Sequence, residues 1–194
     1  LYNMDYKNQL VNTGEINDVG ASVHSNIDES YRRGVEIETN LKLSRKLNWS
    51  GNITFSENKI VAHSEYIDNW DTWGKDTINY QNTDISFSPN IIAKSQLSYD
   101  LGNLQASWII KHIGNQYIDN SQSLDRMLEK YTLNNILFSY DIKIRDIKSA
   151  KITLLVNNIL NKEYINRAWI YRFSSEGWDP TAGEDSDPYI NKDS

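Results

Sequence analysis

The sequence predicts an all-β chain, a wall segment of an antiparallel transmembrane β-barrel with about seven strands. Apolar and polar residues alternate along each predicted strand, as in residues 150–164, where Ile152, Leu154 and Val156 share one parity. Such alternation places one side of a sheet against an apolar surrounding and the other against water. No apolar run approaches the roughly 18 residues of a transmembrane helix. Together with connections that are alternately short and long, these features favour strands that cross a membrane over a soluble core.

The expected strands are residues 1–10, 31–43, 47–59, 91–100, 104–113, 131–144 and 150–164. The connections at one end are short and comprise residues 44–46, 101–103 and 145–149. Those at the other end are long and polar and comprise residues 11–30, 60–90 and 114–130, with a fourth after residue 164. One helical turn is expected over 123–129, and residues 168–173 have the pattern of an extension of the last strand. Because outer-membrane barrels have short periplasmic turns and long outer loops, the long connections are expected to face outside.

The composition restricts the possible partners. The net charge of −6 argues against nucleic acid, because no basic face is available to neutralise phosphates. The absence of cysteine excludes disulfides, thiol catalysis and Cys zinc sites. Six Trp and twelve Tyr suit a membrane interface or a ligand-binding rim. Trp49, Tyr99 and Tyr140 fall on the apolar parity near the short turns, where a membrane girdle of amphipathic rings is expected.

Nothing in the sequence points to an enzyme, a cofactor or a metal site. His24, His63 and His112 are scattered, and none has a metal-binding spacing. Glu36 and Glu38 share a strand face, but we expect them to meet basic residues of neighbouring strands in a wet interior. An acidic cluster near the C-terminus lacks calcium-loop spacing and is expected to be solvated. Its members are Asp179, Glu184, Asp185 and Asp187.

Two sets of residues are candidates for function. Aromatic residues on the long connections are candidates for ligand binding by stacking, although the sequence leaves open that most of them only pack the loops together. They are Tyr66, Trp70, Trp73, Trp169, Tyr171 and Trp178. Polar residues of the opposite strand parity are expected to face the barrel lumen. They are Arg32, Glu36, Glu38, Asn40, Asn52 and Lys111.

Several stretches resemble the C-terminal β-barrel region of TonB-dependent outer-membrane receptors. Residues 154–164 (LLVNNILNKEY) are similar to the family's penultimate strand, with Ile159-Leu160 in place of a Leu-Phe pair. Residues 30–38 (SYRRGVEIE) resemble another barrel strand, and residues 84–90 and 113–120 fit the approaches to strands and outer loops. The resemblance covers nearly the whole chain.

The resemblance implies a roughly 22-stranded barrel in a Gram-negative outer membrane, closed by an N-terminal plug and energised by TonB. Residues 1–194 would then be one unit, the C-terminal part of that barrel, with the plug and the final strand absent. The implied function is uptake of a scarce nutrient: siderophore-bound iron, haem, cobalamin or a glycan. The implied partners are outer-membrane lipid, the plug, the TonB complex and a small-molecule or oligosaccharide ligand. The alternatives are a passive porin-type barrel and a soluble β-sandwich that binds carbohydrate.

Overall fold

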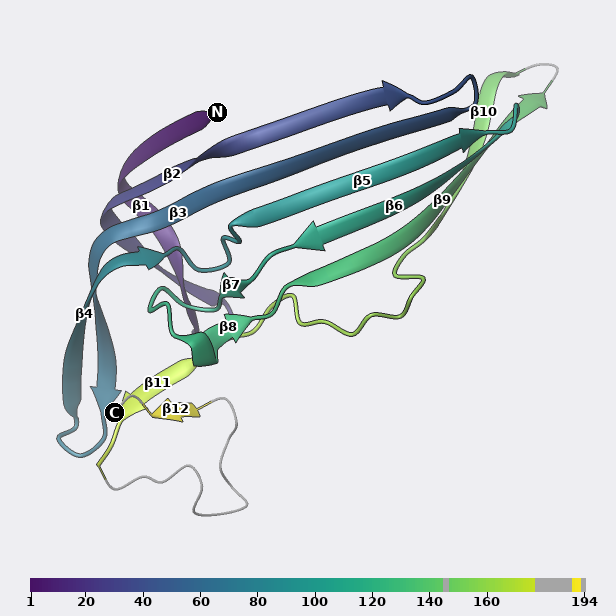
Figure 1. The fold of residues 1–194 in the computed structure, drawn as a ribbon. Coiled ribbons are helices and arrows are strands. Elements are labelled where there is room, and N and C mark those ends of the chain that lie inside the picture. Colours follow the sequence, from purple (N-terminus) through teal and green to yellow (C-terminus); the bar gives the residue numbers. More distant parts are fainter. Residues whose placement is uncertain (145–146, 177–189, 193–194) are drawn as a thin grey trace.

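The computed structural model describes residues 1–144, 147–176 and 190–192, with side chains described for 1–142 and 150–176. Within these ranges the chain is almost entirely β-structure (Figure 1). Its strands are β1 (Tyr2–Ile16), β2 (Ser22–Lys42), β3 (Leu47–Asn69), β4 (Gly74–Asp84), β5 (Ile91–Asp100), β6 (Leu104–Ile113), β7 (Gln116–Tyr117), β8 (Met127–Leu128), β9 (Tyr131–Ile144), β10 (Ile147–Val156), β11 (Tyr171–Ser174) and β12 (Ile190–Lys192). A 3-10 helix, η1 (Leu124–Arg126), precedes β8. Among the described residues, no helix is both long and apolar enough to cross a membrane.

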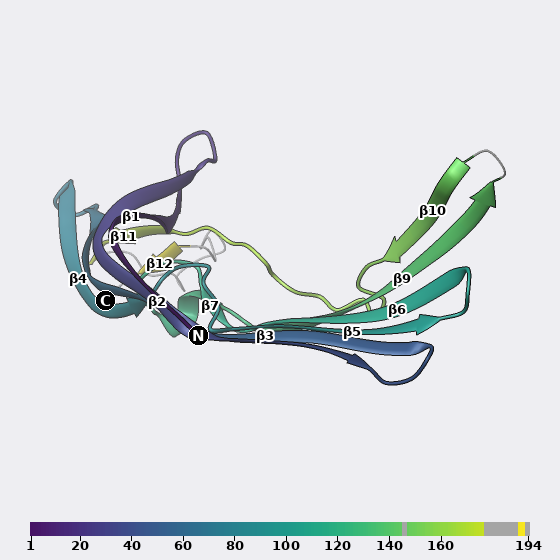
Figure 2. The same cartoon turned by 90° about the horizontal axis from the view of Figure 1, so that it is seen from above.

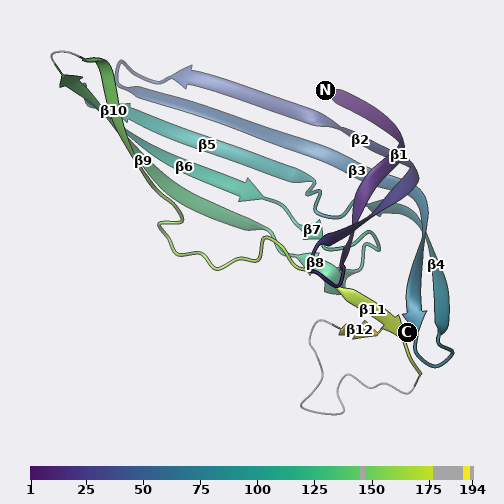
Figure 3. The same cartoon turned by 180° about the vertical axis from the view of Figure 1, so that it is seen from behind.

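Seven strands form an antiparallel sheet in the order β1-β2-β3-β5-β6-β9-β10, in which neighbours are hydrogen-bonded. Strand β4 pairs with β3, β11 pairs with β3 and β12, and β7 and β8 form a separate two-stranded sheet. Strands β2, β3, β5, β6 and β9 run side by side, with tight turns at one end (Figures 1 and 3). The β1–β2 and β3–β4 hairpins, here called the outer hairpins, lie at the other end, which we call the outer end of the sheet. Seen from above, the sheet is a single curved layer (Figure 2). The alternative of a β-sandwich is therefore wrong, because the other sheet in the described part of the chain is only the two-stranded β7–β8 hairpin, which is too small to form a second layer.

The register gives the sheet two chemically different faces. Neighbours on one face are Val35–Phe55, Ile37–Ile53, Leu41–Trp49, Trp108–Ile136 and Phe138–Leu154. Most of these large apolar side chains are exposed, as a lipid-facing surface requires. From residue 35 to 43 the band rises about 26 Å along the strand, and a tilt of about 40° reduces this to about 20 Å, close to the roughly 25 Å apolar band of outer-membrane barrels.

The predictions for 91–100, 104–113 and 131–144 agree with β5, β6 and β9 residue for residue. The prediction that 11–30 and 60–90 are loops is wrong, because β1 and β2 continue outward as one hairpin and β3 and β4 form another. Apolar residues such as Val11, Ile27 and Ile60 are irregularly spaced in these extensions, so the regular alternation that marks a membrane strand is lost although the hydrogen-bonded pairing continues. Asn17 and Asn69 close the two hairpin turns, each accepting backbone N–H groups on its side-chain oxygen.

The predicted seventh strand, 150–164, is too long. Strand β10 ends at Val156, because Asn158 and Asn161 adopt left-handed conformations (φ 50° and 48°). The Asn158 side chain and Lys162 then exchange two hydrogen bonds that close a turn (2.9 and 3.1 Å). Residues 168–173 do not prolong β10 either, since β11 pairs in parallel with β3 and β12. Within 114–130 the helical part is confined to η1, and β7 and β8 form a short hairpin.

The hydrophobic core lies beneath the outer hairpins and not between two sheets. Its buried members are Val11, Ile27, Ile60 and Ile85. They come from β1, β2, β3 and the segment after β4, so the cluster ties the base of both hairpins to the sheet. Burial of four such side chains anchors the outer structure against which the candidate site is built.

Candidate functional site

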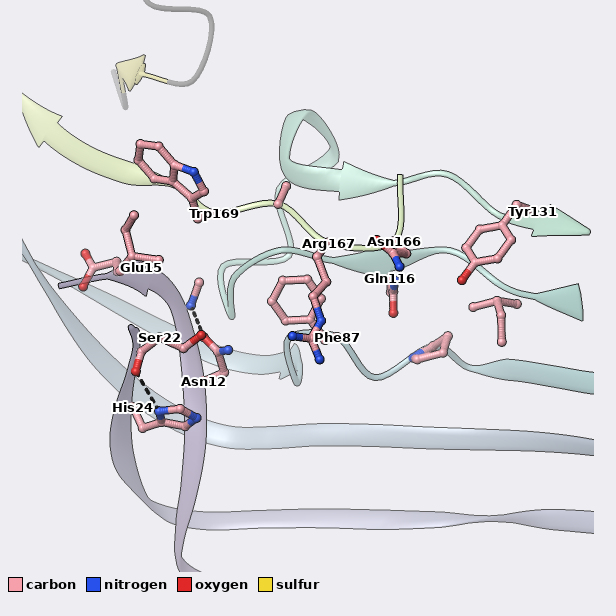
Figure 4. Close-up of a pocket in the computed structure, with 15 residues that line it drawn as sticks. Asn12, Glu15, Ser22, His24, Phe87, Gln116, Tyr131, Asn166, Arg167 and Trp169 are labelled. Atoms are coloured by element: carbon pink, nitrogen blue, oxygen red, sulfur yellow. Dashed lines mark hydrogen bonds between the residues drawn. The ribbon is translucent and has the colours of Figure 1, made fainter. Parts of the chain in front are cut away.

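A cavity of about 730 Å³ opens at the outer end of the sheet (Figure 4). Two of its lining residues, Ile113 and Tyr131, are register partners on the same face as Glu36, through the pairs Ile113–Ile92, Ile92–Thr54 and Thr54–Glu36. The cavity therefore lies on the polar face of the sheet. Its lining residues are Asn12, Gly14, Glu15, Ile16, Ser22, His24, Phe87, Pro89, Ile113, Gln116, Tyr131, Asn166, Arg167, Ala168 and Trp169.

The first wall is the outer part of β1, and it depends on Gly14. This residue has φ +91° and its backbone touches the 114–123 loop, where an added Cβ would lie 2.8 Å from the Ile118 carbonyl oxygen. Its own carbonyl accepts a hydrogen bond from the Ile170 amide (2.9 Å). Glycine is required here both for the left-handed backbone and for the close approach of three chain segments.

A polar clamp joins the walls to one another. Asn120 accepts a hydrogen bond from the Ser86 amide (2.8 Å) and donates one to the Asn12 carbonyl (2.9 Å). The Ser86 hydroxyl donates to the same carbonyl (2.7 Å). Both Ser86 and Asn120 are buried, so these bonds satisfy groups that would otherwise be costly to remove from water. The clamp fixes β1, the segment after β4 and the 114–130 loop in one arrangement.

The 114–130 loop contains a buried ion pair. Arg126 Nε lies 2.9 Å from Asp119 Oδ2, and the two side chains are only 5 % and 1 % exposed. The other oxygen of Asp119 accepts hydrogen bonds from the Ser121 amide and hydroxyl (3.1 and 2.6 Å). The pair holds η1 and β8 against β7, which carries the cavity residue Gln116.

The last wall is a strap, which we define as residues 157–176. Its 166–169 portion lines the cavity, and its far end docks on the β3–β4 hairpin. Arg172 forms a buried ion pair with Glu65, and the Tyr171 hydroxyl donates to Asp68 (2.9 Å). Phe173 stacks on Trp70 with ring centroids 4.0 Å apart. The strap is thus fastened beyond the cavity by contacts more than 100 residues apart in sequence.

The electrostatic environment of this corner is acidic and partly desolvated. Burial raises the pKa of Glu15, the nearby charge of Glu65 raises it further, and Arg172 opposes the shift. Burial also raises the pKa of Glu65, again against the influence of Arg172. Burial lowers the pKa of His63, which stacks on Tyr80, whereas the charge of Asp119 acts the other way. Burial is the largest cause of each of these shifts, and carboxylates and cations act on the two glutamates in opposite directions.

Of the predicted ligand-binding aromatics, Trp169 lines the cavity. Trp70 and Tyr171 lie outside it, tilted against each other and stacked with Phe173. Tyr66 and Trp73 point into solvent from the β3–β4 hairpin, Trp73 being 91 % exposed. Trp178 lies outside the described residues, as do the acidic residues Asp179, Glu184, Asp185 and Asp187.

The predicted lumen residues share one face of the sheet. Glu38 lies opposite Asn52, Asn52 opposite Lys94, and Lys94 opposite Lys111, while Glu36 and Asn40 occupy the same parity of β2. Arg32 is also on this face, and its Nη1 donates to Asn58 Oδ1 (3.1 Å) and Ser88 Oγ (3.2 Å).

The sequence analysis missed several cavity residues: Glu15, His24, Gln116, Asn166 and Arg167. They come from segments far apart in the chain, so no local motif joins them. In the part of the chain that the structure describes, no group of three His, Asp or Glu side chains has an arrangement suited to a metal ion.

An antiparallel sheet with an exposed apolar face, a polar opposite face and tight turns at one end defines the wall of an outer-membrane β-barrel. The family profile described as TonB dependent receptor-like, beta-barrel matches residues 1–159, and the chain belongs to this family. Its members are transport receptors of the outer membrane and not enzymes.

Solved structures share this fold. The closed form of the ferric-catecholate import receptor Fiu from K12 E. coli is similar, with a TM-score of 0.54 and 15 % identity over 87 % of this chain and 21 % of that one. The copper transporter OprC is similar with a TM-score of 0.55 and 14 % identity over 84 % and 22 %. The chain therefore spans about one fifth of the length of these proteins. A comparison with curated proteins found no match.

Proposed function

We propose that the chain forms part of a receptor that binds a scarce nutrient at the surface of a Gram-negative outer membrane and imports it with energy supplied through TonB. The observation that carries this proposal is the cavity on the polar face at the outer end of a sheet whose family is that of TonB-dependent receptors. Trp169 and Arg167 contact the nutrient there. The other predicted aromatics, Tyr66, Trp70, Trp73, Tyr171 and Trp178, remain predictions.

In this proposal the polar face lines the lumen. It carries both signs of charge, since Glu36 and Glu38 lie on β2 while Lys94 and Lys111 lie on β5 and β6. Such a lining suits a plug domain held by many weak polar contacts, each of which is readily exchanged for water when the plug moves. Arg32, Asn40 and Asn52 belong to the same lining.

The test uses the full-length receptor in its own outer membrane. A strain lacking the receptor is complemented with wild type or with the Arg167→Ala, Trp169→Ala double variant, in backgrounds with and without TonB. Growth is measured on ferric catecholates, haemin, cobalamin and neutral oligosaccharides as single limiting nutrients. We expect one of these nutrients to require both the wild-type receptor and TonB, and the double variant to grow poorly on it.

The competing function is passive diffusion through a porin-type barrel. It predicts that growth requires the receptor but is the same with and without TonB. Energised import would be refuted if, on every nutrient whose use requires the receptor, growth were the same with and without TonB.

A further inference from the structure

We propose that the cavity binds a neutral, hydroxyl-rich ligand, chemically a carbohydrate, and not a strongly anionic metal chelate. This inference rests on the proposed function and deepens it by naming the substrate class. It is drawn from the charge, the hydrogen-bonding groups and the aromatic side chains of the cavity wall.

Three buried positive charges at the outer end of the sheet, none of which lines the cavity itself, are already neutralised. Three basic side chains are buried or nearly buried at this end of the sheet, and each is paired with a carboxylate. The pairs are Lys59–Asp84 (3.0 Å), Arg126–Asp119 (2.9 Å) and Arg172–Glu65. A chelate with several negative charges would need cations that are free to face it, because burying unpaired charge is costly.

The described cavity lining itself is close to electrically balanced. Its charged groups are the carboxylate of Glu15 and the guanidinium of Arg167, with His24 as a further titratable side chain (Figure 4). Burial raises the pKa of Glu15, the charges of Glu65 and Asp68 add to this rise, and those of Arg172 and Lys75 oppose it. An anion entering the cavity would therefore meet one guanidinium, but also a carboxylate that opposes its attraction.

The hydrogen-bonding groups of the wall suit hydroxyls. The Gln116 and Asn166 amides each offer donors and an acceptor, Arg167 offers donors only, and the Glu15 carboxylate offers acceptors only. His24 uses Nδ1 against the Ser22 carbonyl (3.1 Å), which leaves Nε2 of the ring for a ligand. A hydroxyl both donates and accepts, so a polyol can satisfy this mixture without any net charge.

Aromatic faces complete the match. Trp169, Phe87 and Tyr131 reach the cavity from three separate segments of chain (Figure 4). The negative face of an aromatic ring attracts the C–H-lined face of a sugar ring while excluding water from it. A volume of about 730 Å³ is in the range of pockets that enclose a ligand of several rings.

The experiment is isothermal titration of the purified full-length receptor in detergent. The probes are a panel of neutral gluco-, manno-, xylo- and galacto-oligosaccharides, a ferric tris-catecholate and haemin. We expect at least one neutral oligosaccharide to bind and both anionic iron compounds to fail. Trp169→Ala should weaken that binding at least tenfold, and Asn166→Ala, at an exposed position, should weaken it several-fold even if Trp169→Ala fails to fold. Tyr99→Ala is the matched control, since Tyr99 and Trp169 are both 44 % exposed but Tyr99 lies on the apolar face near the tight turns.

The inference would be overturned if the ferric tris-catecholate or haemin bound and no neutral oligosaccharide did. It would also be overturned if no compound of the panel bound, or if both cavity variants bound the oligosaccharide with unchanged affinity. The two proposals fail separately. A receptor that imports an iron chelate through TonB and binds no neutral sugar keeps the proposed function and loses the inference. A receptor that binds a neutral sugar but imports it without TonB keeps the inference about the ligand and loses the proposed function.

Discussion

Replacing Asp119 by Asn should loosen the outer loop that supports the cavity. The change keeps the size of the side chain and an oxygen for Ser121, but it removes the carboxylate charge of Asp119 from beside the buried Arg126 guanidinium. Breaking a buried pair on one side costs about 3–5 kcal/mol. At the lower end, about 3 kcal/mol, the opening equilibrium of the loop shifts by about 100-fold.

Hydrogen exchange of the full-length receptor in detergent measures this shift directly. The Ile118 amide donates across the loop to the Arg126 carbonyl (2.9 Å), so its exchange reports opening of the 114–130 loop. We expect Asp119→Asn to accelerate exchange there by about 100-fold, with little change in β5 and β6. The loop would carry Gln116 away from the cavity when it opens.

The control is an ion pair of similar length in an exposed place. Arg33 and Glu57 are 2.8 Å apart with side chains 55 % and 42 % exposed, so Glu57→Gln should cost less than about 1 kcal/mol, or about fivefold in exchange. If Asp119→Asn accelerated amide exchange of the 114–130 loop no more than Glu57→Gln accelerates exchange of β2 and β3, the result would contradict the reasoning. The buried pair would then stabilise the protein no more than the exposed one.

Three further predictions concern the sheet and the strap. Ile53→Lys on the apolar face should destabilise the membrane-inserted protein by about 2–4 kcal/mol. Thr54→Lys, on the polar face, should change the stability little. Equal losses of stability in an unfolding titration in lipid vesicles would contradict a sheet with one apolar and one polar face. Gly34→Ala places a Cβ against the Phe55 carbonyl and should lower the free energy of unfolding by about 1–3 kcal/mol in the same titration. In the control, Gly74→Ala, the added Cβ meets only the hydroxyl of Thr72 at 3.3 Å, so the stability should change little. The raised pKa of Glu15 means that its stabilising contribution is complete below the ordinary value of 4.5 and is lost as pH rises through the raised value. Glu15→Gln should therefore slow amide exchange of the strap at neutral pH and have no effect near pH 4; the same effect at both pH values would show that charge is not its cause.

The membrane-crossing part of the fold could be predicted from the sequence because the alternation of apolar and polar residues that marks it is visible within each strand. Strands β5, β6 and β9 alternate in hydrophobicity over most of their length, since one face meets an apolar surrounding and the other does not. The family resemblance of residues 154–164 is also local, and the family is confirmed by the match over residues 1–159.

The outer structure was predicted poorly for a physical reason. Where the β1–β2 and β3–β4 hairpins leave the apolar band, buried apolar residues such as Ile27 and Ile67 stand irregularly among polar ones, so the period that marks a strand disappears while its hydrogen bonds remain. Two asparagines in left-handed conformations ended β10 earlier than its hydrophobic pattern suggested. Of the six predicted ligand-contact aromatics, Trp169 was placed in the cavity wall, although its partners there were not foreseen.

The sequence by itself determined which residues face the apolar surrounding, where the tight turns fall and which family the chain resembles. The tertiary structure alone decided the cavity, because Glu15, Gln116 and Arg167 meet only after the strap docks on a hairpin more than 100 residues away. Contacts of that separation depend on the free energy of the whole outer assembly, its buried ion pairs included, and no short stretch of the chain encodes them.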